Sequence, residues 1–215
     1  MQADIFSVTK NNPIYLVYNP IKAASPVLRA QAVTRFIYLG RCEDKSKRVY
    51  ELLGIMKRLR GNWTLDIFGN GGDDPQYIQK IEALIAEQLS DKVKFHGWQE
   101  KPWEMIDEAS VLLLHSNSAS EVLPLVLCEA MVRGIPCVSS FCVPGLRDIF
   151  VPDKNGWLYD IDDEETCQQI LQAIIDKEIT LPPPGEVIDS MRKFSAEKVA
   201  SNFINALENE MEKGR

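Results

Sequence analysis

A run of four apolar residues, Val111 to Leu114, sets the strongest limit on what this chain can fold into. Apolar residues that follow one another without alternation are typical of a strand buried on both faces. Such strands belong to parallel sheets that carry helices on both sides. Shortly after this run, Pro124 can begin a helix. The sequence therefore predicts a buried strand that leads through a loop into a helix.

The rest of the sequence repeats this alternation of strand and helix. Strands are expected at 14–18, 34–39, 64–68, 93–96, 111–115, 135–139 and 157–159. Further helices are expected at 47–59, 76–89, 103–108, 146–150, 164–175 and 195–212. Strands that alternate with helices at this spacing indicate right-handed βαβ units. We therefore expect an α/β fold, a Rossmann-like parallel sheet of about six strands with helices on both faces.

Charge and composition exclude several classes of protein. The chain has 215 residues, of which 45% are hydrophobic, so it can bury a sizeable core. Its net charge of −7 argues against a general affinity for nucleic acid or anionic lipid. No run reaches the length of a membrane span, and the first residues lack the apolar core of a signal peptide. We expect a cytoplasmic protein; peripheral attachment to the inner face of the cytoplasmic membrane stays open.

The five cysteines contain no C-x-x-C pair and have no zinc-like spacing with the two histidines. An odd number of cysteines in a chain of this size suggests free thiols in a reducing compartment. Cys128 and Cys137 lie among apolar residues, which is typical of small core side chains. We expect no metal site from these residues.

Two carboxylates, Glu121 and Glu129, lie eight positions apart on either side of Pro124. If the helix begins near that proline, both side chains can flank one pocket beside its unpaired N–H groups. A carboxylate suits a vicinal diol, because two adjacent hydroxyls can both donate to it. The alternative is that Glu129 pairs with Arg133 at i, i+4 and that Glu121 is simply solvated.

A second candidate is the pair Gly40–Arg41, which ends a predicted strand and precedes Lys45 and Lys47. Ligands of open α/β sheets bind at the carboxyl ends of the strands. Arg41 can bind a phosphate with its forked guanidinium, and a lysine can add a point charge. The plainer interpretation is an exposed basic helix start: residues 41–60 hold seven of the 24 Lys and Arg.

Other motifs favour structural roles. The glycines from Gly69 to Gly72 lack dinucleotide-binding spacing and indicate a tight turn. The acids at 160–162 precede a predicted helix and are expected to cap it. Both histidines end predicted strands, and His115 also opens the central loop. Trp98 and Trp103 could stack on a base, although covering the core is the more usual role.

Taken together and in order, six segments resemble the C-terminal half of a GT-B glycosyltransferase of family four. They are Phe36–Arg41, Leu65–Gly71, Val93–Trp98, the E-x7-E motif Glu121–Glu129, Glu129–Val138 and Asn155–Tyr159. The resemblance covers about residues 34–176. Within the family, His96–Gln99 and Pro144–Asp148 most resemble lipopolysaccharide core 1,6-galactosyltransferases that use UDP-galactose.

The resemblance implies a role for each candidate residue. Glu129 would bind the ribose hydroxyls of a UDP-sugar, and Glu121 the hydroxyls of the donor sugar. Backbone amides of the helix start would bind the diphosphate, and other donor contacts would come from two further segments. These residues are Val122, Leu123, Leu125 and Val126 at the helix start, with Gly40, His96, Gly97 and Trp98 elsewhere. Arg41 and a lysine would neutralise the leaving diphosphate, so neither metal nor cofactor is expected.

Two positions depart from the family pattern. The family usually places its lysine five residues after the arginine, where this chain has Ser46. Alignment of the apolar helix face favours Lys47 for that role, with Lys45 as second choice. The family commonly has glycine after the first glutamate, and Val122 narrows the backbone freedom there.

The same resemblance divides the chain into three parts. Residues 1–33 would form a linker and exit strand from an N-terminal acceptor domain outside this sequence. Residues 34–181 would form the nucleotide-sugar-binding domain, and residues 182–215 a C-terminal helix and tail, with Pro182–Gly185 breaking the chain.

The expected function is that of the donor-binding domain of a retaining glycosyltransferase. It would move a hexose, galactose by resemblance, from a UDP-sugar to a glycan such as lipopolysaccharide core. This chain alone should have little or no activity, because it orients no acceptor. The alternative is a nucleotide-sugar-binding subunit that needs a separate acceptor-binding partner. A GT-B sugar-nucleotide epimerase would need catalytic acids that this half does not show.

Overall fold

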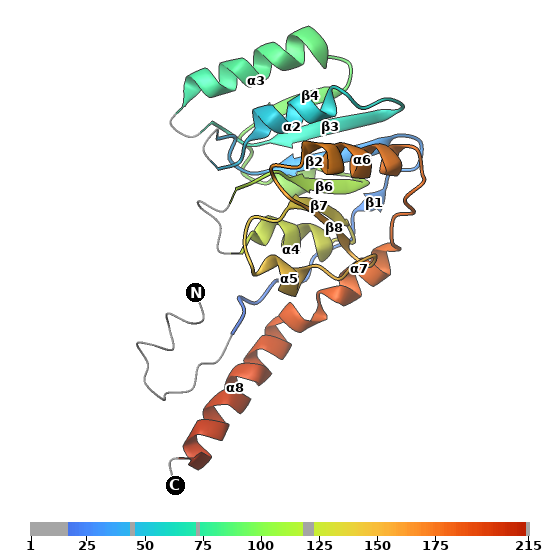
Figure 1. The fold of residues 1–215 in the computed structure, drawn as a ribbon. Coiled ribbons are helices and arrows are strands. Elements are labelled where there is room, and N and C mark those ends of the chain that lie inside the picture. The colour runs from blue at the N-terminus through green and yellow to red at the C-terminus, as the bar shows by residue number, and fades with distance from the viewer. Residues whose placement is uncertain (1–16, 44–45, 72–73, 118–122, 214–215) are drawn as a thin grey trace. The chain divides into compact units, whose positions relative to one another are not determined.

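The computed structural model describes residues 17–43, 46–71, 74–117 and 123–213 (Figure 1). The chain forms two compact units. The larger contains residues 23–191, and the smaller combines the two ends of the chain, up to Lys22 and from Arg192 onward. Among the helices described, none is long and apolar enough to cross a membrane.

The larger unit is built on a six-stranded sheet in the order β4–β3–β2–β6–β7–β8, and all neighbouring strands are parallel (Figure 1). The strands are β2 (Thr34–Leu39), β3 (Trp63–Phe68), β4 (Val93–Gly97), β6 (Val111–Leu114), β7 (Cys137–Ser140) and β8 (Gly156–Tyr159). Every residue of β6 is buried, as its unbroken apolar run predicts. The predicted α/β class with a six-stranded parallel sheet is confirmed.

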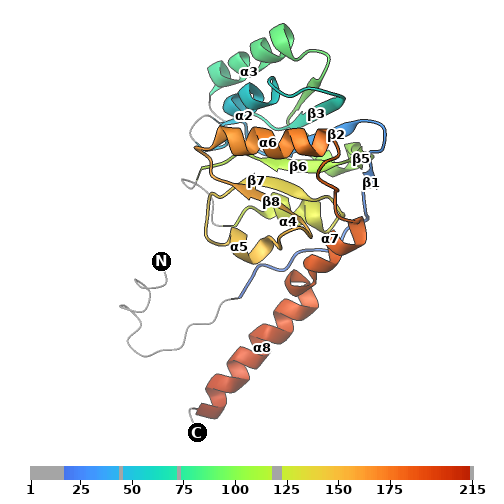
Figure 2. The same ribbon diagram turned by 45° about the vertical axis from the view of Figure 1, so that its right-hand side comes forward.

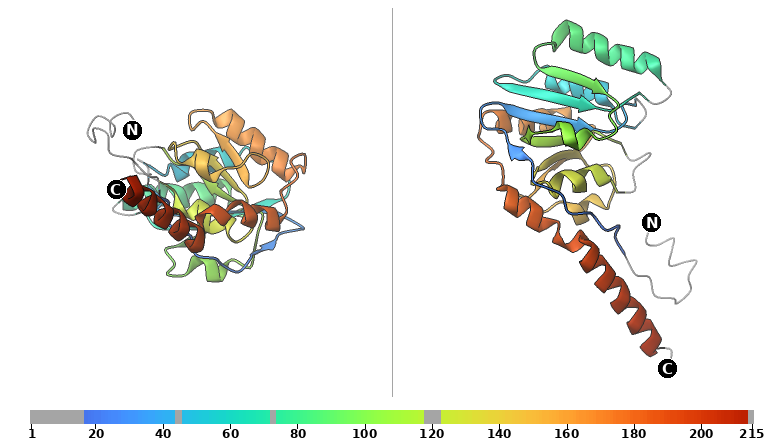
Figure 3. Two further views of the ribbon diagram at one scale, coloured as in Figure 1. Left: turned by 90° about the horizontal axis from the view of Figure 1, so that it is seen from below. Right: turned by 180° about the vertical axis from the view of Figure 1, so that it is seen from behind.

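Three helices pack on one face of this sheet, α2 (Val49–Met56), α3 (Pro75–Gln88) and α6 (Glu164–Ile175). Alternate strand residues such as Phe36 and Tyr38 in β2 point into the core that these helices share. The opposite face carries α4 (Leu125–Met131), which contacts β6 and β7. Seen from behind, α4 lies in front of the sheet and α6 behind it (Figure 3). Helices therefore cover both faces, as predicted.

Shorter elements complete the larger unit. They are β1 (Leu28–Arg29), the 3₁₀ helix η1 (Pro102–Met105), β5 (Glu108–Ala109), α5 (Leu146–Ile149) and α7 (Pro184–Ser190). In the smaller unit, η2 (Arg192–Phe194) leads into α8 (Ala196–Lys213). There the Phe194 ring meets Tyr18 edge-on at 4.9 Å, and its carbonyl accepts from the Ile21 amide at 2.8 Å.

The structure differs from several predictions of local structure. Residues 28 and 29, which lie within the segment expected as a linker and exit strand, form β1, and β1 pairs in parallel with β5 (Figure 2). Strands of two residues are too short to give a periodic signal, and tertiary contacts fix this one: the Arg29 guanidinium donates to the carbonyls of Gly134 and Pro182. Of the strand predicted at 14–18, residues 14–16 lie outside the described residues, and Val17 and Tyr18 form no strand.

The proline run also differs from its prediction as a break. Pro183 is extended and Pro184 is the first residue of α7. Proline suits that position, because the first helical N–H has no partner within the helix. Gly134, at φ +79°, lies so close to Pro184 that a Cβ there would come within 2.7 Å of the proline Cβ.

Helix α6 is capped by a different acid from those predicted. Asp163 Oδ1 accepts from the Thr166 amide at 2.9 Å, which is the N-cap bond. Asp160 accepts from the Asp162 amide at 3.0 Å in the preceding turn, so the acids at 160 and 162 do not cap the helix. Residues 160–165 contain five acids, and nothing in the sequence indicated which one would cap the helix.

His115 links the ends of two strands that are not neighbours. It follows β6, is 1% exposed, and its Nδ1 lies 2.7 Å from the hydroxyl of Tyr159 at the end of β8. The two rings stack with centroids 5.9 Å apart. Burial, helped by the charge of Arg48, lowers the pKa of His115 from 6.5 to about 4. His115 is therefore a structural residue that stays neutral in the folded protein near neutral pH.

The loops after β2 and β3 are in direct contact. The Gly40 amide donates to the Phe68 carbonyl at 3.0 Å, and the Cys42 amide donates to the Asn70 carbonyl at 2.6 Å. A Cβ on Gly69 would overlap the Gly40 carbonyl oxygen, which is backbone and cannot turn away as a side chain could. Glycine at position 69 is therefore required for this approach.

We expect Gly69→Ala to lower the free energy of unfolding by about 1–3 kcal/mol, because the added methyl forces the two loops apart. Gly54→Ala in α2 is the matched control, since a Cβ there meets nothing within 4 Å. That change should raise the stability by roughly 0.5–1 kcal/mol through better helix propensity. Urea unfolding of both variants measures the difference, and equal stabilities would contradict the close approach.

We also expect a stability change with pH that comes from His115. His115 takes up a proton near pH 6.5 in the unfolded chain and only near pH 4 in the folded chain. Its contribution to the free energy of unfolding is therefore fully present above pH 6.5 and is lost as the pH falls toward 4. Between about pH 7.5 and about pH 4.5 the wild type should lose about 2 kcal/mol more than His115→Asn. Parallel urea titrations test this; identical losses would show that His115 is not buried as a neutral base.

Candidate functional site

The strand order creates a switch point between β2 and β6. From β2 the chain moves through β3 to β4 on one side, and from β6 it moves through β7 to β8 on the other. Loops that leave the carboxyl ends of such neighbouring strands diverge, and the crevice between them is the usual ligand site of open α/β sheets. Here the Asn117 amide, after β6, donates to the Ser46 carbonyl, after β2, at 2.8 Å.

A pocket of about 260 Å³ lies at the carboxyl ends of β2, β3 and β4. It is lined by Leu39, Gly40, Arg41, Phe68, Gly69, Asn70, Trp98, Gln99 and Pro102. The Trp98 side chain is 65% exposed there. The turn beneath it is fixed by Gln99 Nε2, which donates to the His96 carbonyl at 2.9 Å, and by the Gly69 amide, which donates to the Gly97 carbonyl at 2.9 Å. The structure thus brings Gly40, Arg41 and Trp98 to one pocket.

The basic residues after β2 form a charged cluster. Arg41 Nη1 lies 2.6 Å from Oε1 of Glu43, with the arginine side chain 59% exposed. The Tyr38 hydroxyl donates to the Arg41 carbonyl at 2.7 Å, which fixes the backbone of this loop. Lys47 is only 9% exposed, and burial lowers its pKa. Arg41, paired with Glu43, and Lys47 both follow β2 at the switch point, and Lys45 lies outside the described residues.

The Glu129 carboxylate is fixed by a residue from another element. Glu129 lies half-buried in α4, and its Oε2 accepts from Trp103 Nε1 of η1 at 3.0 Å. Arg133, the partner that the i, i+4 spacing suggests, donates from Nη1 to the Glu129 main-chain carbonyl at 2.7 Å. Among the described residues no ion pair joins the two side chains. A carboxylate held in this way can still accept hydroxyl groups of a ligand.

The start of α4 is described only in part. Pro124 lies just before the helix in an extended conformation, and the helix begins at Leu125. Leu123 and Val126 are half-buried and Leu125 is 40% exposed. The first N–H groups of a helix have no intrahelical acceptor, so Leu125 and Val126 can offer amides to a ligand. Glu121 and Val122 lie outside the described residues, so the E-x7-E pair cannot be placed as a pair.

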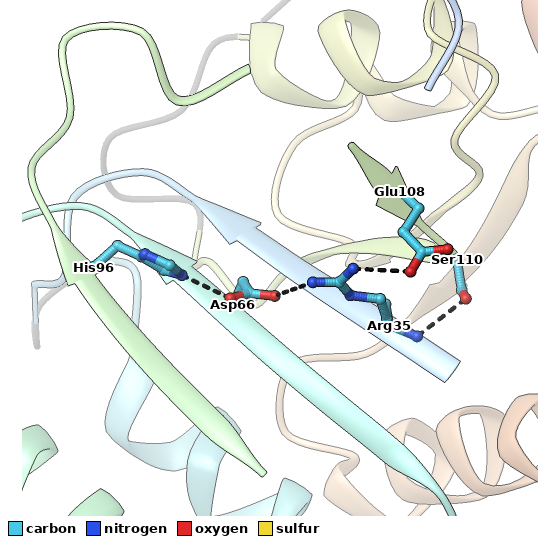
Figure 4. A network of polar contacts seen from close by, with 5 residues as sticks. All are labelled: Arg35, Asp66, His96, Glu108 and Ser110. Atoms are coloured by element: carbon cyan, nitrogen blue, oxygen red, sulfur yellow. Dashed lines mark hydrogen bonds and ion pairs between the residues drawn. The ribbon is translucent and has the colours of Figure 1, made fainter. Parts of the chain in front are cut away.

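His96 is one of the residues predicted to contact the nucleotide-sugar, but its ring is held by other side chains. Its Nε2 lies 2.6 Å from Oδ1 of Asp66, and the ring stacks on Phe68 with centroids 4.4 Å apart (Figure 4). Asp66 Oδ2 forms an ion pair with Arg35 Nη2 at 3.5 Å, and Arg35 Nη1 forms one with Glu108 Oε1 at 3.0 Å. If His96 contacts the nucleotide-sugar, the contact would therefore come from its backbone.

A larger pocket of about 550 Å³ lies beside this network, on the sheet face and away from the switch point. Arg35, Asp66 and Glu108, which line it, already satisfy one another (Figure 4). We therefore place the candidate site at the smaller pocket, where the strands end. Among the residues described, no group of three or more His, Cys, Asp or Glu could hold a metal ion.

Trp103 makes a contact with a candidate site residue that the sequence did not reveal. The residue was singled out as an aromatic that could stack on a base or cover the core, and it instead donates a hydrogen bond to Glu129. The two positions are 26 residues apart and come together only through the sheet topology. No local pattern could have paired them.

Comparison with known proteins agrees with this architecture. Residues 26–208 match the family model described as glycosyl transferases group 1. The chain is 37% identical over 175 residues to lipopolysaccharide 1,6-galactosyltransferase of Escherichia coli (strain K12), covering 77% of this chain and 47% of that protein. The enzyme of the same name from Salmonella typhimurium is 31% identical over 210 residues, covering 93% of this chain and 56% of that one.

A solved structure shows the same fold over most of the chain. The apo form of the lipopolysaccharide outer core galactosyltransferase WaaB superposes with a TM-score of 0.81 and 30% sequence identity, covering 91% of this chain and 56% of that one. The chain thus spans about half the length of the relatives that it matches. Because the family model matches far more than half of its residues, this chain belongs to the glycosyl transferases group 1 family.

Proposed function

We propose that this chain is the donor-binding part of a retaining glycosyltransferase that moves a hexose, galactose, from a UDP-sugar to a lipopolysaccharide core glycan. The observation that carries the proposal is the pocket at the carboxyl ends of the strands, which Arg41 and Pro102 line. Trp103, the residue after Pro102, donates a hydrogen bond to Glu129. The sugar and the acceptor follow from the 1,6-galactosyltransferases that the chain resembles. The acceptor would be bound by residues beyond this half, and the reaction would take place in the cytoplasm at the inner membrane face.

In this proposal each group has a distinct task. Glu129 accepts hydrogen bonds from the two ribose hydroxyls, and Glu121 accepts hydrogen bonds from hydroxyls of the donor sugar. Gly40, Trp98 and the backbone of His96 and Gly97 border the nucleoside. These assignments follow the family resemblance, and they fit the chemistry because a carboxylate accepts from a vicinal diol in charge-assisted hydrogen bonds.

Departure of the diphosphate would be assisted by cations. The bond between the anomeric carbon and the β-phosphate oxygen breaks, and its electron pair goes to that oxygen. A hydroxyl oxygen of the acceptor forms the new bond to the anomeric carbon, and its proton passes to the departing diphosphate. Arg41 and Lys47 would stabilise the developing negative charge, together with the amides at Leu123, Leu125 and Val126. Two protein cations can meet this need, so the proposal includes no metal.

The alternative of a binding subunit with a separate partner is less well supported. The relatives matched over most of this chain are named as galactosyltransferases, not as accessory subunits.

Isothermal titration with UDP-galactose, UDP-glucose, GDP-mannose and UDP is the direct test of the proposed function. We expect UDP and the UDP-sugars to bind and GDP-mannose not to bind. Failure of every uridine nucleotide to bind would overturn the proposal.

Glu129→Ala should weaken UDP binding roughly tenfold to a hundredfold, because hydrogen bonds to a charged acceptor contribute about 1.5–3 kcal/mol. Glu104→Ala is the matched control: it removes a carboxylate from η1 that pairs with Lys101 at the surface. That variant should bind UDP like the wild type. Isothermal titration calorimetry measures the UDP affinity of the wild type and the two variants. Equal affinity of Glu129→Ala and wild type would remove Glu129 from the site.

Arg41→Ala should weaken UDP about tenfold while leaving uridine almost unchanged, because only UDP offers phosphate oxygens to the guanidinium. Arg58→Ala serves as control, since Arg58 forms an exposed ion pair with Glu164. Calorimetric titration of UDP and of uridine into both variants gives the loss of affinity for each ligand. An equal loss for UDP and uridine would argue against a phosphate contact.

A further inference from the structure

Trp103 and Arg133 hold Glu129 from two sides. The indole N–H binds the Glu129 carboxylate, and Arg133 binds the carbonyl of the same residue one helical turn away. The guanidinium carbon of Arg133 also lies 4.2 Å from the centroid of the Trp103 ring. A cation at that distance over an indole is attracted to its face. The three side chains form a closed arrangement that we call the Glu129 clamp.

The clamp connects the carboxylate to the pocket. Trp103 lies in η1 next to Pro102, which lines the pocket at the strand ends. Proline at the start of η1 fixes the backbone that carries the indole. The position of Glu129 therefore depends on the same short segment that forms one wall of the pocket.

The clamp also leaves the carboxylate able to bind a ligand. An ionised carboxylate has about four acceptor positions, and the indole uses one of them on Oε2. In the described part of the chain Oε1 of Glu129 accepts no hydrogen bond. A long glutamate side chain otherwise loses rotamer freedom when a ligand binds, and fixing it beforehand removes that cost.

We propose that Trp103 is a positioning residue, which orients the Glu129 carboxylate for the vicinal hydroxyls of the nucleotide ribose and so favours ribonucleotides over deoxynucleotides. The inference rests on the proposed function, because it assumes that Glu129 binds the ribose. Trp103 itself needs no contact with the ligand. Arg133 supports it, because its guanidinium lies over the Trp103 ring.

Trp103→Phe is the test, since phenylalanine keeps an aromatic ring for Arg133 and removes the N–H donor, together with the second ring of the indole. Calorimetry should show UDP binding about fivefold to tenfold weaker than in the wild type. Binding of 2′,3′-dideoxy-UDP, which has no hydroxyls for Glu129, should be the same in both proteins. Trp157→Phe is the control, because Trp157 packs against the core in β8, and it should bind both ligands like the wild type.

A double-mutant comparison separates positioning from simple structural support. In a Glu129→Ala background, Trp103→Phe should cause no further loss of UDP affinity. An additional loss of similar size, or equal weakening of UDP and dideoxy-UDP, would overturn the inference. If Trp103→Phe does not fold, Arg133→Lys replaces it, with a smaller loss for UDP expected and no loss for dideoxy-UDP.

The two proposals fail differently. If the wild type does not bind UDP, the proposed function fails, and the inference fails with it. If the wild type binds UDP and Glu129→Ala weakens it, but Trp103→Phe binds both ligands normally, only the role of Trp103 is overturned.

Discussion

The parallel pairing of β2 with β6 is the constraint on which the candidate site depends. These two strands start the two halves of the sheet, and the chain leaves them in opposite directions. Their pairing is possible because β6 is apolar throughout and can be buried between helices on both faces. The crevice at their ends follows from this order, whatever side chains later line it. Arg41 and Lys47 follow one of these strands, and the loop to Glu129 follows the other.

Contacts between loops then give the site its shape. Gly69 allows the loop after β3 to touch the loop after β2, and Asn117 ties the loop after β6 to the same region. His115 holds the end of β6 against Tyr159 of β8. These contacts involve mostly backbone groups and small or buried side chains. The charged groups of the site are therefore presented from a frame that packing and main-chain hydrogen bonds already fix.

The sheet could be predicted from the sequence because buried strands and amphipathic helices leave strong periodic signals. The strand from Thr34 to Leu39 and the helix from Glu164 to Ile175 have the predicted bounds. The strand Leu28–Arg29 and the helix at Pro184 could not be found, since their formation depends on distant partners such as Glu108 and Gly134. The same limit applies to the site. Gly40 and Arg41 follow from their place at a strand end, whereas the pairing of Trp103 with Glu129 exists only in the folded chain.

The burial of Lys47 has a consequence for how an anion would enter. Lys47 as a whole residue is only 9% exposed, so much of its side chain has left water when the chain folds. An anion that binds near Lys47 would therefore meet this residue in a medium that screens charge poorly. The cost of removing the side chain from water is met during folding, before any ligand arrives.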